Sequence, residues 1–310
     1  MSATHSRDPA VLLASLVKRY GDKKAVDGLD LRVDQGEIFG LLGPNGAGKT
    51  TTLEIIAGLR APTSGTVRVA GLDPTAERQE LVRVLAVQPQ QAQLFPLLTA
   101  EETLTLWRTF YERPGDVAEL LAAVSLTESA RTQVRNLSGG QERRLLIACA
   151  LIGRPRAVVL DEPSTGLDPN ARAELWEVLL RFRDEGGTVM LSTHSMDEAQ
   201  SLCDRVAIID HGRLLAEGSP AELIARHAPH HLVTFSRDAG HARDLLASRP
   251  DVLAIDVRGT KVHVSTSDPT AVSALLRGID PPVRDVVVRA SGLDEVYREL
   301  TGRVFTEVKV

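Results

Sequence analysis

The chain has 310 residues, 43% of them hydrophobic and 25% charged, which is ordinary for a globular protein with one large and one smaller domain. Its formal net charge of -5 gives no electrostatic case for a nucleic-acid partner, and none is expected. The 2 cysteines, Cys149 and Cys203, lie in apolar stretches, which excludes a disulfide framework and favours a reducing compartment.

The N-terminal residues 1–9 are polar and lack the apolar core of a signal peptide. The apolar run at 145–152 is much shorter than the about 20 residues that a bilayer-spanning helix needs. We therefore expect a polar tail over 1–9 and no membrane span in this chain.

The first part of the chain has the pattern of strands. Apolar segments at 11–17 and 25–33 predict two strands, the second partly alternating, as in a sheet with one face in water. The apolar segment 37–42 predicts a buried strand, and 65–69 predicts another.

The stretch after this buried strand fits G-x-x-x-x-G-K-[ST], the phosphate-binding loop. Its residues are Gly43, Pro44, Asn45, Gly46, Ala47, Gly48, Lys49, Thr50 and Thr51. The glycines admit a phosphate chain close to the backbone, and the helix expected at 51–59 offers its positive end. We expect Lys49 to reach the β- and γ-phosphates and Thr50 to hold Mg²⁺. A glycine-rich turn with a chance Lys-Thr pair is the weaker interpretation, because strand, loop and helix follow in order.

The middle of the chain predicts a small helical subdomain at about 91–150. Residues 100–126 have the spacing of helices, whereas 81–87 predicts a buried strand followed by an amide-rich loop at 88–93. Earlier in the chain, Tyr20 lies between two expected strands; it could stack on an adenine ring or simply cover local apolar surface.

Ser138 precedes an apolar helical stretch and marks a second candidate anion site. The serine is a good N-cap, and Gly139 and Gly140 leave backbone amides exposed at the start of the helix. A simple capped turn would not need paired glycines, so we favour the functional interpretation. Gln141 completes the run Leu-Ser-Gly-Gly-Gln.

Two carboxylates, Asp161 and Glu162, end an apolar strand at 157–162. Open α/β sheets bind ligands at the carboxyl ends of their strands. Asp161 suits Mg²⁺, which prefers oxygen ligands, and Glu162 can orient or deprotonate an attacking water. A second buried strand, 188–193, ends at His194, which we place at the same sheet edge. An acidic turn and a structural histidine are the plain alternatives.

The large domain is completed by a loop at 164–169, a helix from Asn170, a helix at 196–203 and a strand at 206–209. The pair Gly212-Arg213 marks a hairpin turn after this strand.

Together these motifs resemble the ATP-binding subunits of ABC (ATP-binding cassette) transporters. The resemblance covers roughly residues 10–225, and the motifs follow the family's order. Many ATPases share the phosphate loop, but Leu-Ser-Gly-Gly-Gln upstream of an apolar strand ending in Asp-Glu-Pro is highly specific. The resemblance implies an α/β P-loop ATPase core with an antiparallel β subdomain and a helical subdomain.

The resemblance also implies roles for individual residues. Residues 43–51 are the Walker A loop, Tyr20 is the adenine-stacking aromatic, and 158–161 with Glu162 are Walker B and the catalytic base. Residues 137–141 are the ABC signature, and His194 is the switch histidine that senses the γ-phosphate.

Two further loops receive roles in the same way. Residues 164–168, ending at Asp168, are the loop that crosses the dimer. Gln90 is the glutamine that senses Mg²⁺ and the transport partner. Gln88 and Gln91 compete for that role, but Gln90 follows the proline and precedes Leu98-Thr99 by the family's usual interval.

The implied activity is ATP hydrolysis coupled to transport, with ATP and Mg²⁺ held between Walker A of one copy and the signature of another. The implied partners are a second ATP-binding subunit, in a homodimer, and a separate integral membrane permease at the cytoplasmic face of the membrane. Residues 40–52, 98–104 and the small tail resemble the drug and antibiotic exporter branch, which favours small hydrophobic cargo.

Two other functions compete with transport. Soluble ABC ATPases of DNA repair or translation usually carry long coiled coils or two cassettes in one chain, and neither pattern occurs here. A nucleotide-dependent binding switch with negligible hydrolysis is disfavoured by Glu162 and His194.

The tail reads as a linker at 226–231 and an accessory α+β domain at 232–310. The histidines at 227, 230 and 231 lack supporting ligands at metal-binding spacing, so zinc or nickel binding is disfavoured. Strands and helices are expected at 232–235, 239–247, 252–257, 261–266, 269–276, 283–288 and 293–300. The first six follow the β-α-β-β-α-β ferredoxin-like order. We expect this domain to support dimerisation or to tune coupling.

Overall fold

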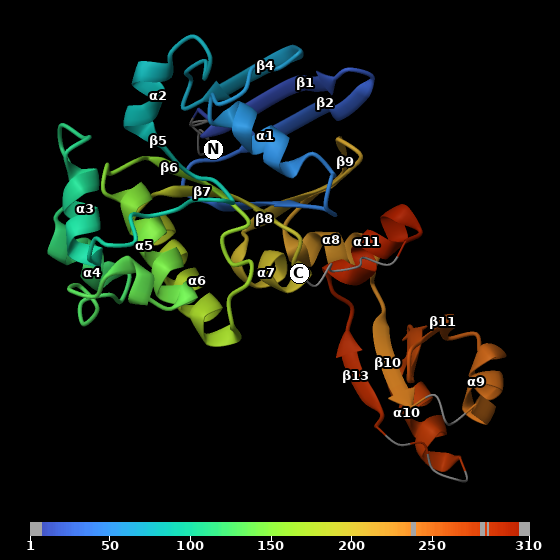
Figure 1. The fold of residues 1–310 in the computed structure, drawn as a ribbon. Helices are drawn as coiled ribbons and strands as arrows, with labels where there is room; N and C mark the ends of the chain where they lie inside the picture. The colour runs from blue at the N-terminus through green and yellow to red at the C-terminus, as the bar shows by residue number, and fades with distance from the viewer. Residues whose placement is uncertain (1–7, 237–239, 280–282, 284, 304–310) are drawn as a thin grey trace, which may run out of the picture. The chain divides into compact units, whose positions relative to one another are not determined.

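The computed structural model describes residues 8–236, 240–279, 283 and 285–303. These residues form two compact units, of which the first ends at Ser219 and the second covers Pro220–Phe305. Figure 1 shows the first unit in blue to yellow and the second in orange to red.

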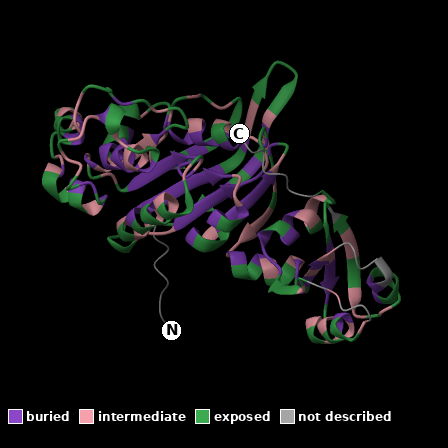
Figure 2. Ribbon diagram, turned by 60° about the horizontal axis from the view of Figure 1, so that its bottom comes forward, coloured by how far each residue is buried: buried purple, intermediate pink, exposed green. Residues whose placement is uncertain are grey.

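A six-stranded sheet forms the centre of the first unit, with strand order β5-β6-β7-β3-β8-β9. Its strands are β3 (Ile38–Leu42), β5 (Leu85–Gln88), β6 (Ala157–Asp161), β7 (Thr188–Thr193), β8 (Arg205–Asp210) and β9 (Arg213–Gly218). All neighbours pair in parallel except β8 and β9, which form the hairpin that the sequence predicts. Every residue of β3, β6 and β7 is buried, as their unbroken apolar runs require, and Figure 2 shows these strands in purple.

An antiparallel three-stranded sheet forms the second layer of this unit. It has the order β2-β1-β4 and contains β1 (Val11–Tyr20), β2 (Lys23–Val33) and β4 (Ser64–Val69). Its alternating burial leaves one face to solvent. Apolar residues of both sheets and of α1 (Lys49–Ile56) share one buried core, which includes Leu16, Phe39 and Ile56. The two sheets are therefore fixed against each other around the helix that follows the phosphate loop.

The remaining helices of the first unit include a group from the middle of the chain. The helices are α2 (Arg78–Val84), α3 (Ala100–Arg108), α4 (Val117–Ala123), α5 (Gly139–Leu151), α6 (Pro169–Asp184) and α7 (Met196–Leu202). Figure 1 shows α3, α4 and α5 grouped together, and they pack against one another as a helical subdomain.

One prediction for this region needs correction. The strand predicted at 81–87 is helix α2 up to Val84 and strand only from Leu85. Leu81 is buried while Val82 is 57% exposed, so the apolar run is one face of a helix and not a strand buried on both sides. The helices predicted within 100–126 are present as α3 and α4, which Pro114 and Gly115 separate, and Asp116 caps α4.

The second unit contains a four-stranded antiparallel sheet with order β11-β12-β10-β13. Its elements are α8 (Pro220–His227), β10 (His231–Ser236), α9 (Gly240–Ala247), β11 (Val252–Arg258), β12 (Lys261–Thr266), α10 (Pro269–Gly278), β13 (Val287–Ala290) and α11 (Leu293–Thr301). From β10 to β13 they follow the β-α-β-β-α-β order that the sequence predicts. Val233, Phe235 and Leu276 belong to a separate hydrophobic core that is made of residues of the second unit.

Some boundaries in the second unit differ from the expected ones. Helix α8 packs against α11 and has a buried residue, Leu223, and it extends to His227, so it occupies part of the segment 226–231 expected as a linker. The strand expected at 283–288 begins only at Val287, and residues 280–282 and 284 lie outside the described residues.

Replacing Phe235 by Ala should destabilise the second unit by about 3–5 kcal/mol, because a fully buried aromatic ring leaves a cavity. In urea unfolding we expect the transition of the second unit to move to lower urea concentration and the transition of the first unit to stay unchanged. Leu245→Ala, at a residue that is 50% exposed in the same unit, is the matched control and should change stability by less than about 1 kcal/mol. A shift of both transitions by Phe235→Ala would show that the units do not unfold separately.

Candidate functional site

The carboxyl ends of three buried strands lie side by side, and the predicted catalytic groups follow them. β7 pairs with β3 on one side and with β6 on the other. The phosphate loop, residues 43–51, follows β3, Glu162 follows β6 and His194 follows β7. The parallel register therefore assembles groups that are far apart in the sequence.

The phosphate loop is held in a conformation that only glycine permits at residue 48. Gly48 has φ 107°, and a β-carbon there would lie 2.3 Å from the carbonyl oxygen of Ala25. The Lys49 side chain is 5% exposed, and its Nζ donates hydrogen bonds to the carbonyls of Gly43 (2.7 Å) and Pro44 (3.2 Å). Burial lowers the pKa of Lys49, while the charges of Glu162 and Asp161 oppose that shift.

Glu162 is the point where the other predicted groups meet. Its Oε1 lies 3.8 Å from Lys49 Nζ and 3.1 Å from His194 Nδ1. Its Oε2 accepts hydrogen bonds from Gln90 Nε2 (3.1 Å) and Thr165 Oγ1 (3.2 Å). With a side chain that is only 9% exposed, Glu162 combines a buried carboxylate with several polar neighbours.

Gln90, and not Gln88, makes the contact with Glu162. Gln88 ends β5 and is buried, and neither its side-chain nitrogen nor its oxygen has a hydrogen-bond partner among the described residues. Of the candidates that the sequence left open, Gln90 therefore has the geometry of a group that can report on Glu162.

Ser192 is a site residue that the sequence analysis did not single out. Its hydroxyl donates a short hydrogen bond to Asp161 Oδ1 and accepts one from the Glu162 backbone N–H (3.0 Å). Glu162 has φ 50°, a left-handed conformation that is costly for a residue with a β-carbon, and Ser192 holds it there. The available signal was a serine near the end of an otherwise apolar strand, two positions before His194.

The oxygen groups expected to hold Mg²⁺ fit a hard cation. Asp161 is 5% exposed at the end of β6, and its carboxylate has no ion pair within the described part of the chain. Thr50 is the second residue of α1, directly after the lysine of the phosphate loop. A buried carboxylate and a hydroxyl are the kind of donors that Mg²⁺ takes beside phosphate oxygens.

The residues predicted to form a second anion site lie at the start of α5. Ser138 and Gln141 form a reciprocal capping box: Gln141 N–H donates to Ser138 Oγ (3.2 Å), and Ser138 N–H donates to Gln141 Oε1 (2.9 Å). Gly139, at the first position of the helix, is exposed, whereas Gly140 is buried, so the predicted exposure is found at only one of the two glycines. In the described chain, no hydrogen bond or ion pair joins these residues to Lys49 or Glu162.

Two other predicted residues lie at the ends of secondary-structure elements. Asp168 caps α6, accepting hydrogen bonds from the N–H groups of Asn170 and Ala171, each at 3.0 Å. Tyr20 ends β1 and is 42% exposed, with Lys18 Nζ 5.4 Å and the Arg60 guanidinium 5.3 Å from its ring centroid. Its ring thus has the exposure that stacking on a base requires.

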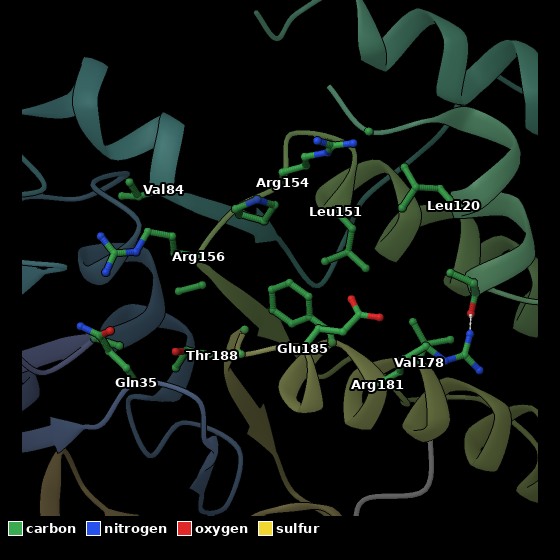
Figure 3. A pocket seen from close by; sticks show the side chains of 18 of the residues that line it. Gln35, Val84, Leu120, Leu151, Arg154, Arg156, Val178, Arg181, Glu185 and Thr188 are labelled. Atoms are coloured by element: carbon green, nitrogen blue, oxygen red, sulfur yellow. Dashed lines mark hydrogen bonds between the residues drawn. The ribbon is translucent and has the colours of Figure 1, made fainter. Parts of the chain in front are cut away.

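A cavity of about 690 Å³ lies at the opposite ends of β6 and β7, away from these groups. Figure 3 shows Gln35, Val84 and Arg156 on one side of it and Leu120 and Val178 on the other. None of the residues predicted to bind the nucleotide lines this cavity, so the nucleotide site is not assigned to it.

Comparison with known proteins gives the family. Residues 26–165 match the family model described as "ABC transporter". The "Nod factor export ATP-binding protein I" of Rhizobium sp. (strain N33) is 39% identical, over 95% of this chain and 97% of that protein. The chain belongs to the ABC transporter family. A protein of the same name from Cupriavidus metallidurans is 41% identical to this ABC ATP-binding subunit over 92% of the chain and 95% of that protein.

Solved structures agree with this family. An ATP-binding subunit of an ABC transporter is similar with a TM-score of 0.62 and 29% identity, over 70% of this chain and 92% of that one. A dimeric cassette in a post-hydrolysis state, bound to ADP and Pi, has a TM-score of 0.60 and 28% identity, over 67% and 98%. The predicted family and P-loop α/β fold are confirmed, and ATPase activity follows from the family.

Replacing Ser192 by Ala in this ABC ATPase subunit should lower kcat about 10–100-fold, because Ser192 donates to the Asp161 carboxylate and a hydrogen bond to a charged group is worth about 1.5–3 kcal/mol. ATP binding should change little, since the described contacts of Ser192 do not include the phosphate loop. Steady-state ATPase assays and a fluorescent ATP analogue measure the two effects. Ser64→Ala, at an exposed serine of β4, is the control, and an unchanged kcat for folded Ser192→Ala would contradict the assignment.

Proposed function

We propose that this chain hydrolyses ATP as a homodimer and thereby drives a separate membrane permease that exports small hydrophobic compounds, including drugs. The observation that carries the proposal is the contact of Glu162 with Lys49, Gln90 and His194 in a chain that builds a second anion site elsewhere. The Glu162 cluster supplies the groups that hydrolysis needs, and the start of α5 offers a separate place to bind phosphate. This separation suits an ATP site that is shared between two copies of the chain.

Hydrolysis in this proposal depends on positioning and on charge. Lys49 places a positive charge beside the β- and γ-phosphates, and Glu162 takes a proton from the attacking water. Gln90 donates a hydrogen bond to one oxygen of the Glu162 carboxylate and so orients it, and His194 Nδ1 lies 3.1 Å from the other oxygen. Mg²⁺, held by Asp161, Thr50 and Gln90, would neutralise charge on the phosphates. Tyr20 would stack on the adenine ring.

Dimer formation follows from the separation of the two anion sites. The capping box keeps Ser138 and the amides of Gly139 and Gly140 at the start of α5, where they can bind the γ-phosphate of ATP on another copy. Loss of that phosphate on hydrolysis removes contacts that only the closed dimer makes, so the dimer opens. The similar post-hydrolysis cassette is described as dimeric, which supports the arrangement.

A groove beside Gln90 suits a membrane partner. It has a volume of about 1140 Å³ and is lined by residues of α2, the end of β5 and the segment after α3, including Gln88 and Pro89. Val82 and Phe110, both in this groove, are 57% and 70% exposed. Within the described residues, no helix is long and apolar enough to cross a membrane. We propose that the permease docks here, which places it next to the residue that contacts Glu162.

The proposed direction of transport is based on relatives of this chain, and the proposed location is based on its membrane partner. Proteins named for Nod factor export match nearly the whole chain, which supports export as the direction. The resemblance to the drug and antibiotic exporter branch supports small hydrophobic cargo. A subunit bound to the cytoplasmic side of a permease would be a peripheral membrane protein.

Replacing Glu162 by Gln should abolish ATP turnover and trap an ATP-bound dimer, because the carboxylate that accepts the proton is lost while the phosphate contacts remain. Size-exclusion chromatography with light scattering in Mg-ATP should give a dimer for Glu162→Gln and a mixture with monomer for the wild type. Adding Ser138→Ala should weaken the trapped dimer. Normal hydrolysis by Glu162→Gln would refute the assigned base.

Replacing Phe110 by Arg should prevent docking of the permease without changing basal ATPase activity, since the side chain is 70% exposed and lies in the groove. Affinity purification of the tagged chain from membranes should recover a multispanning protein with the wild type and lose it with Phe110→Arg. Leu253→Arg, at an exposed position in the second unit, is the matched control. Recovery of ribosomes or nucleic acid in place of a membrane protein would favour a non-transport role.

A further inference from the structure

The cavity of Figure 3 is a second place where the first unit can hold a small molecule. Its lining includes residues of α4, the end of α5, α6 and the first residues of β6 and β7. Its volume of about 690 Å³ lies in the range of sites that bind cofactors and other small molecules. The chemistry of the lining therefore indicates what such a molecule must carry.

Apolar side chains form part of this lining. Val178 is buried, and Leu120, Leu151 and Phe182 are partly buried. A β-carbon at Gly187 would lie 2.4 Å from the Phe182 ring, so glycine at this position lets the ring lie against the turn before β7. The cavity thus offers apolar surface that is already in place for the hydrocarbon part of a ligand.

Two arginines on the turn between α5 and β6 bring positive charge to the cavity. Arg154 and Arg156 both line it, and neither side chain makes a hydrogen bond or an ion pair within the described residues. A third arginine, Arg181, also lines the cavity but donates a hydrogen bond to the carbonyl of Ala123 (3.0 Å). Guanidinium groups without a partner favour a carboxylate, sulfate or phosphate group.

Carboxylates from other elements line the same cavity. Glu119 of α4 and Glu185, directly after α6, are exposed and have no ion pair in the described parts of the chain. The third carboxylate, Asp116, is occupied as the cap of α4, where it accepts hydrogen bonds from two backbone N–H groups (2.9 and 3.0 Å). Figure 3 shows the Glu185 carboxylate well apart from the Arg156 guanidinium. The lining therefore holds both signs of charge at separate places.

We propose that this cavity binds an amphipathic zwitterion, a small molecule with an acidic group and an amine at opposite ends of an apolar body. Its acidic group pairs with Arg154 and Arg156, and its amine pairs with Glu185. Its apolar body lies on Leu151 and Val178. A ligand with only one charge leaves half of these groups unmatched, so the lining selects a molecule that carries both.

This site is separate from the ATP site. No residue of the phosphate loop, of the signature at 137–141 or of the cluster around Glu162 lines the cavity. One chain can therefore hold ATP and the zwitterion at the same time.

The test uses ω-aminododecanoate as the probe, with its N-acetyl derivative and its methyl ester for comparison. The N-acetyl derivative keeps only the negative charge, and the methyl ester keeps only the positive one. Isothermal titration of the full chain at neutral pH, below the concentration at which each probe forms micelles, should give a Kd for ω-aminododecanoate that is about 2–5-fold lower than for either derivative, as expected for one additional exposed ion pair.

Two variants separate the two ends of the ligand. Glu185→Gln should weaken binding of ω-aminododecanoate and its methyl ester about 2–5-fold and leave the N-acetyl derivative unchanged. Arg156→Gln should weaken ω-aminododecanoate and the N-acetyl derivative and leave the methyl ester unchanged. Arg156 is chosen because Arg154 also lines the groove proposed for the permease. Arg131→Gln and Glu177→Gln, at exposed residues outside the cavity, are the matched controls.

Saturating Mg-ATP should leave the Kd of ω-aminododecanoate unchanged, and both variants should keep the wild-type ATPase rate. No binding by the wild type, a Kd that neither variant changes, or competition by ATP would overturn the proposal. So would an N-acetyl derivative that binds as tightly as ω-aminododecanoate, because it would show a site for a simple anion. None of these outcomes bears on the dimeric ATPase, which the Glu162→Gln variant tests separately.

Discussion

The approach of the Glu162 carboxylate to the Lys49 ammonium, 3.8 Å apart and almost completely buried, is the interaction on which this site depends. Each charge would be costly at this depth without the other. Lys49 is held by carbonyls of its own loop, and Glu162 is held by Ser192 in a backbone conformation that few residues adopt. The parallel pairing of β3, β7 and β6 brings both residues to one edge of the sheet, so the register of these strands also sets the geometry of the candidate site.

Features that depend on residues close together in the sequence could be predicted, whereas features that depend on distant residues could not. The phosphate loop, the Ser138 cap and the end of β6 were predicted because glycine pairs, caps and apolar runs act over a few residues. The family and the α/β core followed from the order of those motifs. Ser192 was missed, because its importance comes from pairing across strands with residues about 30 positions away.

The errors have the same origin. The run at 81–87 has the composition of a strand, and only packing shows that Leu81 points inward while Val82 faces solvent. A β-carbon at residue 140 of α5 would lie 2.6 Å from the β-carbon of Ala171 in α6, and this close contact between the two helices cannot be read from either helix alone. Tertiary contacts that override local pattern thus set the limit of prediction in this chain.

The β8–β9 hairpin adds a consequence for how the protein acquires its activity. Gly212 N–H donates to the carbonyl of Ala47, and the Gly212 carbonyl accepts from Asp27 N–H. The phosphate loop is therefore joined at Ala47 to the β8–β9 turn at Gly212, which is joined in turn to β2 at Asp27. These segments can meet only after most of the first unit has been synthesised. Such long-range closure is slow compared with local helix formation. During synthesis, nucleotide affinity should therefore appear late, and bound ATP should mark chains whose core has already closed.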